Sequence, residues 1–521
     1  MTPASIGRRI LKRARRYFRS TKRATKPSLR PAGSLPPPAL GLGWMYNNET
    51  PGGGIRIHAQ SEAAYPEVTG YIVPTLVNYG ARDLAGRCLE WLLSVQQPDG
   101  SFLEPDCGQK FIFDTGQALR GLLAMSDDVP AAEEAARKAA VYLQREMEDG
   151  GTNGFGPRYN ELWTEIPEPI HLYVLPPLLA AAERFGLPDL KKGCLGCTDH
   201  YLQHPEALRL ADLTHFLAYQ LEALIDLGQP ERALPVLEKL AELQQKDGAV
   251  RGREGVRWVC TPGLLQLAIC WYKIGWHEPA GLAVEWAERH QLASGGFIGS
   301  YGKGASYFAD REISWAVKYF LDAHRLRLES FFDRHAGEFP DTVAPADGRL
   351  SGLSALVSEG DSIVEVGCGK GRFLKALAAS KRSLSCTGVD LSLKMLQCLP
   401  SGMSAVQGSL EHAPLPSDAF DVSFSVEAVE HSPNVAAAVR ELVRLCKPGG
   451  RVAIIDKHVD HWGRLECPSW ERWPSRDALA DALRAAGCDE VRVEAVGHDD
   501  TPAGESIMAI WTARKTRSGI C

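Results

Sequence analysis

The sequence of 521 residues contains no apolar run long enough to span a bilayer. It also lacks the apolar core of a secretory signal, because Lys and Arg dominate its first thirty residues. The 13 cysteines show no disulfide framework, and the C-x-x-C pair of Cys194 and Cys197 has no second pair at a zinc-site spacing. We therefore expect a cytoplasmic protein without structural disulfides and without a bound metal.

Residues 1–30 contain no acid, whereas they contain eleven Lys or Arg. The apolar residues of this segment share one helical face and are Ile6, Ile10, Leu11, Ala14, Tyr17 and Phe18. Such a helix would lie on an anionic membrane surface, at the periphery of the inner membrane. The same composition is also typical of a solvated, disordered tail. No nucleic-acid recognition motif accompanies the charge, so we expect no nucleic-acid partner.

Length and composition indicate a globular protein of two or three domains. Hydrophobic residues account for 45% of the chain, and the net charge of −6 excludes a general binder of polyanions. Changes of pattern divide the chain into a Pro- and Gly-rich tail and linker at 1–60, a helical domain at 61–332, a linker at 333–350 and an α/β domain at 351–515.

Apolar residues recur at helical spacing from Tyr65 to Leu328. Turns that combine Gln with Gly or Asp end several of these helices and begin at Gln96, Gln144, Gln244 and Gln291. Successive turns are separated by about 48 residues or about twice that length, and about 48 residues make one helical hairpin with its loop. The repeat predicts either an open solenoid or a closed ring.

Three segments carry a resemblance to a known architecture: Thr69–Thr75, Gln96–Phe102 and Phe113–Gln117. They resemble the (α/α) toroids of terpenoid cyclases and prenyltransferases and the helical domain of glucuronyl C5-epimerases. The resemblance implies an all-α toroid that binds or modifies a glycan. The Asp-x-Asp-Asp motif that protonates squalene-type substrates and the zinc ligands of protein prenyltransferases are absent. Cyclase and prenyl-transfer chemistry are therefore not expected.

Carboxylates and aromatic side chains, which together suit carbohydrate binding, concentrate in the loops of the helical segment. The candidates are Tyr65, Glu67, Tyr71, Asp114, Tyr159, Glu161, Trp163, Glu165, His171, Trp258, Tyr301, Tyr307, Asp310, Glu312 and Trp315. In a ring of helices such loops would surround a central cavity. We expect fewer than half of these residues to line it.

From Ser362 to Ala513 strands alternate with helices. This order predicts a doubly wound, Rossmann-like sheet with an antiparallel hairpin at one edge and a site at the carboxyl ends of its parallel strands. The first strand leads into a loop with Gly367, Gly369 and Gly371, where the missing side chains let the backbone approach a ligand.

Motifs in this part of the chain resemble those of class I S-adenosylmethionine-dependent methyltransferases of the type 11 group. They are Glu365–Gly371, Gly388–Ser392, Gly408–Val422, Val426–His431 and Lys447–Val452. The resemblance implies S-adenosylmethionine as the cofactor. It places in the cofactor site Glu365, Gly367, Cys368, Gly369, Gly371, Asp390, Leu391, Ser409, Leu410 and Glu427.

Asp390 follows the second strand, where a carboxylate accepts hydrogen bonds from both ribose hydroxyls. Ser409 stands where the family often has Asp, and Leu410 would pack on the adenine ring. Methyl transfer to a hydroxyl depends on positioning and on a base near the strand ends. His431 is the first candidate base, and a loop histidine that contacts the cofactor is an equal interpretation.

Asp456 and His458, with His461, are further candidates for the base, because they follow the fifth strand at the same end of the sheet. We expect no more than one of these three to act. The insertion Trp462–Trp473 contains three Trp, which would stack on sugar rings or pack against the toroid, and we favour packing.

These parts together predict a methyltransferase that acts on a hydroxyl of a cell-surface polysaccharide or a lipid-linked glycan, with the toroid binding or modifying that glycan. One alternative is methylation of an isoprenoid or quinone-like lipid, for which we expect an aromatic and aliphatic cavity without carboxylates. Another is a cofactor-binding scaffold in a polysaccharide assembly complex. The intact cofactor motifs argue against the scaffold.

Overall fold

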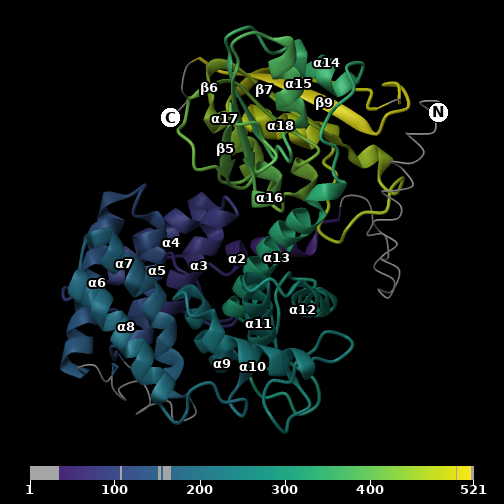
Figure 1. Cartoon of the computed structure of the whole chain (residues 1–521). Coiled ribbons are helices and arrows are strands. Elements are labelled where there is room, and N and C mark those ends of the chain that lie inside the picture. The colour runs from purple at the N-terminus through teal and green to yellow at the C-terminus, as the bar shows by residue number, and fades with distance from the viewer. Residues whose placement is uncertain (1–33, 106–107, 151–153, 156–165, 500, 518–521) are drawn as a thin grey trace. The chain divides into compact units, whose positions relative to one another are not determined.

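The computed structural model describes residues 34–105, 108–150, 154–155, 166–499 and 501–517 (Figure 1). The contact pattern divides the chain into two compact units, which we call the helical unit (Pro37–Ser330) and the α/β unit (from Phe331 onward). The basic segment 1–30 lies outside the described residues, as do four of the candidate residues, Tyr159, Glu161, Trp163 and Glu165. None of the helices in the described ranges is both long and apolar enough to cross a membrane.

The helical unit is built from helices joined by short loops. The helices are α2 (Pro37–Asn47), α3 (Pro66–Asn78), α4 (Arg82–Val95), α5 (Ile112–Met125), α6 (Pro130–Gly150), η2 (Glu168–Val174), α7 (Leu175–Phe185), α8 (Pro188–Gln203), α9 (Thr214–Asp226), α10 (Pro230–Glu242), α11 (Thr261–Lys273), α12 (His277–His290) and α13 (Ser314–His335). Two short strands, β1 (Val259–Cys260) and β2 (Ser300–Tyr301), pair antiparallel. They were not predicted, because a two-residue strand leaves no alternating pattern.

Helix α3 contacts both α5, which follows it closely in the chain, and α13, which comes last. The Thr75 hydroxyl donates to Asp322 at 2.8 Å, and the Tyr79 hydroxyl donates to the Leu321 carbonyl at 2.8 Å. The helices in between are also connected. Helix α5 packs on η2, η2 on α9 and α9 on α11, and Tyr219 of α9 meets Tyr319 of α13 at 6.3 Å. The series of helix contacts therefore returns from α13 to α3.

Three of the four predicted turns share one hydrogen-bond pattern. Gln96, Gln244 and Gln291 each donate from Nε2 to the carbonyl of the glycine four residues later, at 3.2, 3.0 and 2.9 Å. The same amide group also donates at 2.9 Å to a carbonyl in another helix, which is Ala135 in α6, Pro279 in α12 and Pro37 in α2. The repeat seen in the sequence is therefore a loop that ties one helix to another.

Two predictions for the helical unit are wrong. Gln144 lies inside α6, because the alanine-rich sequence continues the helix to Gly150. Residues 37–47 form α2 and not a linker, since two prolines at the first helical positions lack only N–H groups that a helix start leaves unbonded. In α2 the buried Trp44 donates from Nε1 to Glu312 at 2.7 Å.

The α/β unit begins with the last turn of α13, so the connection to its first full helix is shorter than predicted. Its helices are η3 (Ala336–Glu338), α14 (Gly348–Ser354), α15 (Arg372–Ser380), α16 (Leu393–Leu396), η4 (Val429–His431), α17 (Val435–Leu445), η5 (Val459–His461) and α18 (Arg476–Ala485). Its strands are β3 (Ser362–Val366), β4 (Ser385–Asp390), β5 (Ser404–Gln407), β6 (Phe420–Val426), β7 (Cys446–Lys457), β8 (Cys488–Ala495) and β9 (Met508–Lys515).

The seven strands form one mixed sheet in the order β5-β4-β3-β6-β7-β9-β8. Strands β3 to β7 are parallel, and β9 pairs antiparallel with both β7 and β8. The order of the strands reverses between β3 and β6, which is where such sheets bind ligands. This confirms the Rossmann-like sheet and the antiparallel edge hairpin expected from the sequence.

Alternating residues of the strands bury two separate cores, one on each face of the sheet. Val364 and Val366 of β3 pack with residues of α17 and α18, such as Leu442 and Leu479. Their neighbour Ile363 packs on the opposite face with residues of α14 and α15. A sheet that is covered on both faces leaves only its strand ends open to a ligand.

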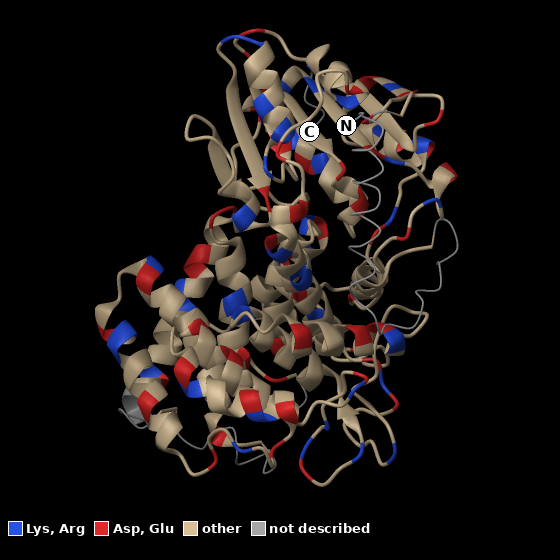
Figure 2. Cartoon of the chain, turned by 45° about the vertical axis from the view of Figure 1, so that its right-hand side comes forward, with Lys and Arg blue, Asp and Glu red and all other residues tan. Residues whose placement is uncertain are grey.

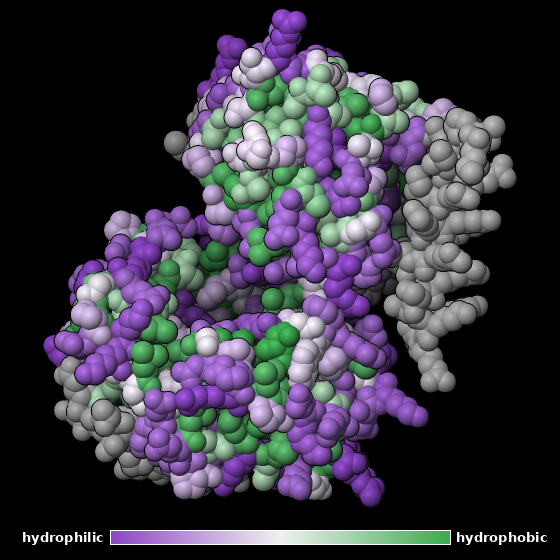
Figure 3. Space-filling model, in the orientation of Figure 1, coloured by the Kyte–Doolittle hydropathy of each residue, from purple (hydrophilic) through white to green (hydrophobic). Residues whose placement is uncertain are grey.

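Charges of both signs are interspersed over the described surface of each unit (Figure 2). On the face drawn in Figure 3, hydrophilic residues predominate and apolar residues form patches between them. In Figure 2, positions of both charge signs are mixed along the helices and strands of each unit, in agreement with the modest net charge of −6.

Candidate active site

The loop between β3 and α15 has the backbone conformation that its glycines predict. Gly367, Gly369 and Gly371 have φ angles of 76°, 52° and 70°, in the left-handed region that favours glycine. A Cβ on Gly367 would lie 2.4 Å from the Cβ of Ala428, and one on Gly371 would lie 2.2 Å from Leu399. A Cβ on Gly369 would meet no atom within 4 Å. Packing therefore requires two of the glycines, and the third faces open space.

Asp390 ends β4 and is bonded to this loop. Its Oδ2 accepts a hydrogen bond from the Gly369 N–H at 2.7 Å, and its Oδ1 accepts one from the Ser392 N–H at 2.9 Å. Burial raises the pKa of Asp390, the two N–H groups lower it, and the nearby Asp333 raises it. The resulting pKa is about 6. The carboxylate is thus held by the backbone at the place where the family binds ribose.

Glu365 is 2% exposed, and its Oε2 has no hydrogen-bond partner among the described residues. Burial raises its pKa, Arg372 opposes this rise, and Asp390 adds to it. The resulting pKa lies well above the usual value. A buried polar atom without a partner costs free energy unless a ligand supplies the missing hydrogen bond. The unpartnered Oε2 of Glu365 and the open space beside Gly369 therefore fit a bound cofactor that carries hydrogen-bond donors.

The remaining predicted cofactor residues surround this loop. Cys368 is buried, and its N–H donates to the Val389 carbonyl at 3.0 Å. The Leu391 carbonyl accepts from Gln407 at 3.1 Å. The Ser409 hydroxyl accepts from the His412 N–H at 3.1 Å, and the half-buried Leu410 packs against the core of the sheet. Their contact with the cofactor stays a prediction.

Glu427 follows β6 with a φ of 53°, which is unusual for a residue with a side chain. It accepts hydrogen bonds from Arg349 and, at 3.2 Å, from Arg372. Burial would raise the pKa of Glu427, but Arg372 and Arg349 lower it to about 2. The sequence did not single out these arginines, although Arg372 directly follows the glycine loop.

His431 lies in η4, beside the carboxyl end of β6. Its ring meets Phe332 edge to face at 5.2 Å, and its Nε2 lies 3.6 Å from Glu430. Burial lowers its pKa to about 4, so the imidazole is neutral at pH 7. Its Nδ1 has no hydrogen-bond partner among the described residues, which leaves a lone pair or a proton for a ligand.

Beside His431 lies a buried ionic cluster that the sequence did not suggest. The Lys457 ammonium donates to Glu430 and, at 3.3 Å, to Glu471, and Trp473 donates to Glu471 at 2.7 Å. Glu430, His431 and Glu471 bring potential metal-ligand atoms within 4.8 Å of one another. The ammonium already supplies a positive charge to both carboxylates, so a metal ion would have to displace it.

The other three candidate bases have different partners, and Asp456 and His458 do not pair with each other. His461 lies in η5, where its ring meets that of His458 at 4.4 Å. Asp456 accepts hydrogen bonds from the N–H groups of Glu430 and Lys457, at 3.0 and 2.8 Å, and burial raises its pKa to about 6. His458 Nε2 lies 3.1 Å from Arg476, and its Nδ1 lies 3.2 Å from Asp460. Asp456 therefore orients η4 and β7, and His431 has the freer side chain.

The tryptophan insertion is largely packed within the α/β unit. Trp470 is 5% exposed and meets Phe331 at 5.3 Å. Trp473 is 1% exposed and meets Trp462 edge to face at 5.4 Å. Burial of two of the three rings favours the packing interpretation over stacking on sugars, although their contact is with the α/β unit itself.

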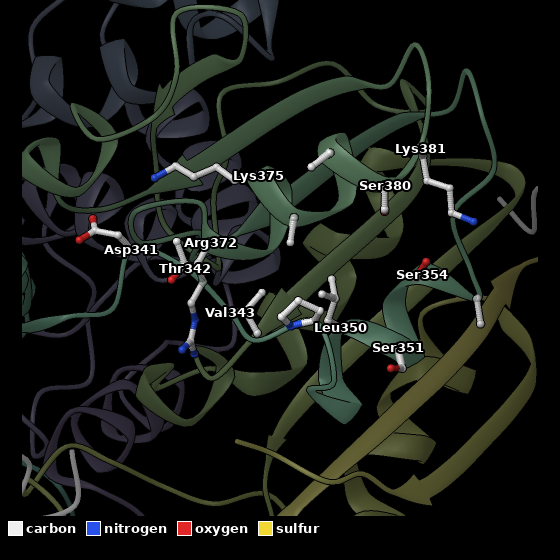
Figure 4. Close-up of a pocket in the computed structure, with 14 residues that line it drawn as sticks. Asp341, Thr342, Val343, Leu350, Ser351, Ser354, Arg372, Lys375, Ser380 and Lys381 are labelled. Carbon is white, nitrogen blue, oxygen red and sulfur yellow. The ribbon is translucent and has the colours of Figure 1, made fainter. Parts of the chain in front are cut away.

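A groove of about 860 Å³ runs between α14 and α15 of the α/β unit (Figure 4). Arg372, Lys375 and Asp341 lie near one of its ends, and Lys381 with Ser354 near the other. Arg372 also pairs with Glu427, so this end of the groove adjoins the glycine loop.

In the helical unit most of the predicted cavity residues that the structure describes fall into two groups. Three belong to neither: Tyr65 is half-buried, Trp258 is buried and Asp310 is exposed. Tyr301 donates to the His290 carbonyl at 2.8 Å, and Glu312 accepts from Trp44 and Ser294, so these residues stabilise loops. The second group is buried, wholly or in part, among the helices that contact one another in series and comprises Glu67, Tyr71, Asp114, His171, Tyr307 and Trp315.

Comparison with known proteins identifies the α/β unit. A family model described as a methyltransferase domain of type 11 matches residues 364–454. The uncharacterized methyltransferase YcgJ of Bacillus subtilis (strain 168) is 31% identical over 28% of this chain and 64% of that protein. A solved structure of YcgJ is 20% identical over 33% of this chain and 98% of that chain, with a TM-score of 0.27.

Two further relatives have more specific descriptions. A fatty-acid O-methyltransferase of Mycolicibacterium smegmatis is 33% identical over 24% of this chain and 44% of that protein. A chloroplastic 2-methyl-6-phytyl-1,4-hydroquinone methyltransferase of Oryza sativa subsp. japonica is 26% identical over 30% of this chain and 47% of that protein. The chain thus spans about half to two thirds of the length of these curated relatives.

The C-terminal part of the chain contains a class I methyltransferase domain. Its cofactor is S-adenosylmethionine, as the sequence predicted, and its activity is that of an S-adenosylmethionine-dependent methyltransferase. The cofactor supplies the methyl group from its sulfonium. The glycine loop, Asp390 and Glu365 are the residues that we expect to hold and orient it, and their contact with the cofactor stays a prediction.

Proposed function

We propose that the whole protein methylates a hydroxyl of a glycan, which is a cell-surface polysaccharide or a lipid-linked sugar. In this proposal the helical unit is an (α/α) toroid that binds the glycan, and the α/β unit transfers the methyl group. The observation that carries the transfer step is the cofactor cradle, in which Asp390 is bonded to Gly369 and Oε2 of Glu365 is left without a partner.

His431 is the proposed base. It lies at the carboxyl end of β6, it is neutral at pH 7, and its Nδ1 is available. A base of this kind removes the hydroxyl proton as the oxygen attacks the methyl group. Asp456 and His458 remain second candidates, with most of their hydrogen-bonding atoms already bonded to the protein.

The side chains buried in the helical unit favour a sugar over an apolar chain. An isoprenoid or quinone-like acceptor calls for an aromatic and aliphatic cavity without carboxylates. Instead Asp114, Glu222 and Gln266 are buried among the tyrosines of this unit. The fatty-acid and phytyl-hydroquinone methyltransferases match 24% and 30% of this chain, and their names support the lipid acceptor as the second candidate.

A purely scaffolding role is the third candidate, and the intact cradle opposes it. A cofactor-binding scaffold would bind S-adenosylmethionine in a calorimetric titration without transferring its methyl group, so binding together with methyl transfer rules this candidate out. Methyl transfer is then measured with radiolabelled S-adenosylmethionine on glycan and lipid fractions in parallel. Label in the glycan supports the proposal, and label only in extractable lipid would replace it with the second candidate.

We also propose that the basic segment 1–30 attaches the protein to an anionic membrane. Co-sedimentation with vesicles that contain anionic lipid, before and after removal of residues 1–30, tests this attachment. Equal binding by the two proteins would contradict it.

A further inference from the structure

Within the segment Phe113–Gln117, packing and hydrogen bonding between the helices account for some side chains and leave others without a structural role. The Thr115 hydroxyl accepts from the Phe102 N–H at 3.2 Å, and a Cβ on Gly116 would lie 2.6 Å from Val174. Both residues are therefore required by packing between α5 and its neighbours. The Asp114 carboxylate and the Nε2 group of Gln117 have no such explanation, whereas Gln117 Oε1 accepts from Arg120 at 3.3 Å.

Asp114 is 1% exposed, and neither of its carboxylate oxygens has a hydrogen-bond partner within the described residues. Gln117, also buried, leaves its Nε2 without a partner. The two residues are three positions apart on α5, so their side chains lie on the same face. Leaving an acceptor and a donor unsatisfied costs on the order of several kcal/mol, which a structure retains where a ligand completes the bonds.

A second carboxylate lies close to Asp114. Glu67 occupies the first turn of α3 and Asp114 the first turn of α5, and these helices pack so closely that a Cβ on Gly70 would lie 2.4 Å from the Gln117 carbonyl. Burial raises the pKa of Glu67 to about 8. Burial, Glu67 and Glu104 raise the pKa of Asp114 well above its usual value, and Tyr65 lowers it. Neighbouring acids of this kind share a proton.

Aromatic side chains from several helices surround the two acids. Tyr71 meets Tyr319 at 6.4 Å, Tyr219 meets Tyr319 at 6.3 Å, and His215 meets Tyr307 at 6.1 Å. The charge of Glu67 raises the pKa of Tyr71, Tyr219 and Tyr307, so three elements of the helical unit face it. Tyrosine rings and carboxylates together suit a sugar, with its apolar ring faces and its hydroxyls.

The cations of this region have other partners. Lys318 pairs with Asp322 at 3.0 Å, and Lys273 pairs with Glu222 at 2.9 Å and with Asp226 at 2.6 Å. The Arg120 guanidinium stacks on Tyr173 at 4.6 Å, and its Nε–H donates to Gln117 Oε1 at 3.3 Å. Glu67 and Asp114 form no ion pair with the described residues. A ligand that carries a carboxylate or phosphate would be repelled, so the site favours an uncharged sugar.

We propose that the helical unit contains a second catalytic centre, in which Glu67 and Asp114 hydrolyse a glycosidic bond of an uncharged glycan. Glu67 donates its proton to the glycosidic oxygen as the bond from that oxygen to the anomeric carbon breaks. A water molecule adds its oxygen to the anomeric carbon and gives a proton to the Asp114 carboxylate. Gln117 and the tyrosines hold the sugar. An acid that keeps its proton and a carboxylate that can accept one provide the proton donor and the base that this chemistry requires.

The inference rests on the proposed role of the helical unit in glycan binding, but not on methyl transfer.

The test incubates the full-length protein in ¹⁸O-labelled water with separate uncharged glycans, which are a glucan, a mannan, a galactan and chitin oligosaccharides. Alginate, a uronate polymer, is the charged comparison. We expect one ¹⁸O atom at each new reducing end of at least one uncharged glycan and none from alginate. Glu67→Gln and Asp114→Asn should each lower the rate about 100- to 10,000-fold.

Two controls separate catalysis from folding and from methyl transfer. Circular dichroism and melting curves establish that both variants fold, since each replaces an acid by an amide of the same shape. Asp390→Ala should lose cofactor binding and keep the hydrolysis. Absence of labelled ends from every uncharged glycan, full activity of Glu67→Gln and Asp114→Asn, or cleavage of alginate alone would each overturn the proposal. Methyl transfer into glycan without hydrolysis would overturn it and leave the proposed function intact.

Discussion

The carboxylate of Asp390 accepts a hydrogen bond of 2.7 Å from the backbone N–H of Gly369. This bond joins the end of β4 to the glycine loop that follows β3, so one side chain both shapes the loop and faces the space beside it. The ends of the two neighbouring strands β3 and β4 therefore supply the residues of the predicted cofactor site.

Asp390→Ala should weaken S-adenosylmethionine binding by at least about 100-fold, because it removes charge-assisted hydrogen bonds worth about 1.5–3 kcal/mol each. Isothermal titration calorimetry measures the change. Asp489→Ala, which removes an exposed carboxylate from β8 of the same unit, is the matched control and should bind as the wild type does. Equal affinities of the two variants would contradict the assigned role of Asp390.

Alanine at Gly367 and at Gly369 should have different consequences. At Gly367 the new Cβ would lie 2.4 Å from Ala428, so unfolding should become easier by about 1–3 kcal/mol. At Gly369 nothing lies within 4 Å, so the backbone cost is about 1 kcal/mol while the methyl group enters the cofactor space. Denaturant titration and calorimetry separate the effects. Equal loss of stability in both variants would argue against an open space at Gly369.

His431→Gln should lower kcat for a hydroxyl acceptor by about 100- to 10,000-fold and leave S-adenosylmethionine affinity unchanged. The base acts when unprotonated, and its pKa is lowered to about 4, so the wild-type rate should stay level from pH 8 to pH 6 and fall only as the pH approaches 4. A pH–rate profile checks this. Parallel assays of Asp456→Asn and His458→Gln show whether either residue is the base instead.

The stability of the helical unit should fall as the pH rises. The folded protein keeps a proton on Glu67 up to a pKa of about 8, whereas the unfolded chain loses it near the ordinary value of 4.5. The folded state therefore binds more protons between these values, and its stability should decrease across this window by on the order of 2 kcal/mol, after allowance for partial exposure.

Urea titrations of the wild type and of Glu67→Gln between pH 5 and pH 9 measure that dependence. The variant should lose most of the slope, because the amide does not titrate. Glu62→Gln, at an exposed position a few residues earlier in the chain, should keep it. A slope that survives in Glu67→Gln would show that another group is responsible.

Removal of the Gln291 side chain tests the loop pattern of the helical unit. Gln291→Ala deletes hydrogen bonds to the carbonyls of Gly295 and Pro37, both of 2.9 Å, and should lower the free energy of unfolding by about 1–3 kcal/mol. Differential scanning calorimetry measures the loss. Gln203→Ala, at the end of α8, is a control outside the repeated loops, and an equal loss there would argue against a special role for Gln291.

Local sequence patterns determine much of the α/β unit. A buried strand, a glycine loop and a carboxylate after the next strand depend on residues close together in the chain, and parallel strands bring their carboxyl ends to one edge. Gly367, Gly369, Gly371 and Asp390 could therefore be predicted. In the helical unit, the same locality explains why the helices were anticipated and why Gln96, Gln244 and Gln291 formed a repeat.

Long-range packing decided what these patterns left open. Arg349 lies 78 residues from Glu427, and Lys457 lies 27 residues from Glu430, so no spacing in the sequence could pair them. The same holds for α2, whose prolines indicated a linker, whereas the tertiary contacts of Trp44 and Gln291 stabilise a helix there. The sequence alone identified the methyltransferase domain and its cofactor, because the motif residues lie together at the carboxyl ends of the parallel strands. Only the fold brought Glu67 beside Asp114, because the free energy that keeps two acids buried together comes from packing of the whole helical unit.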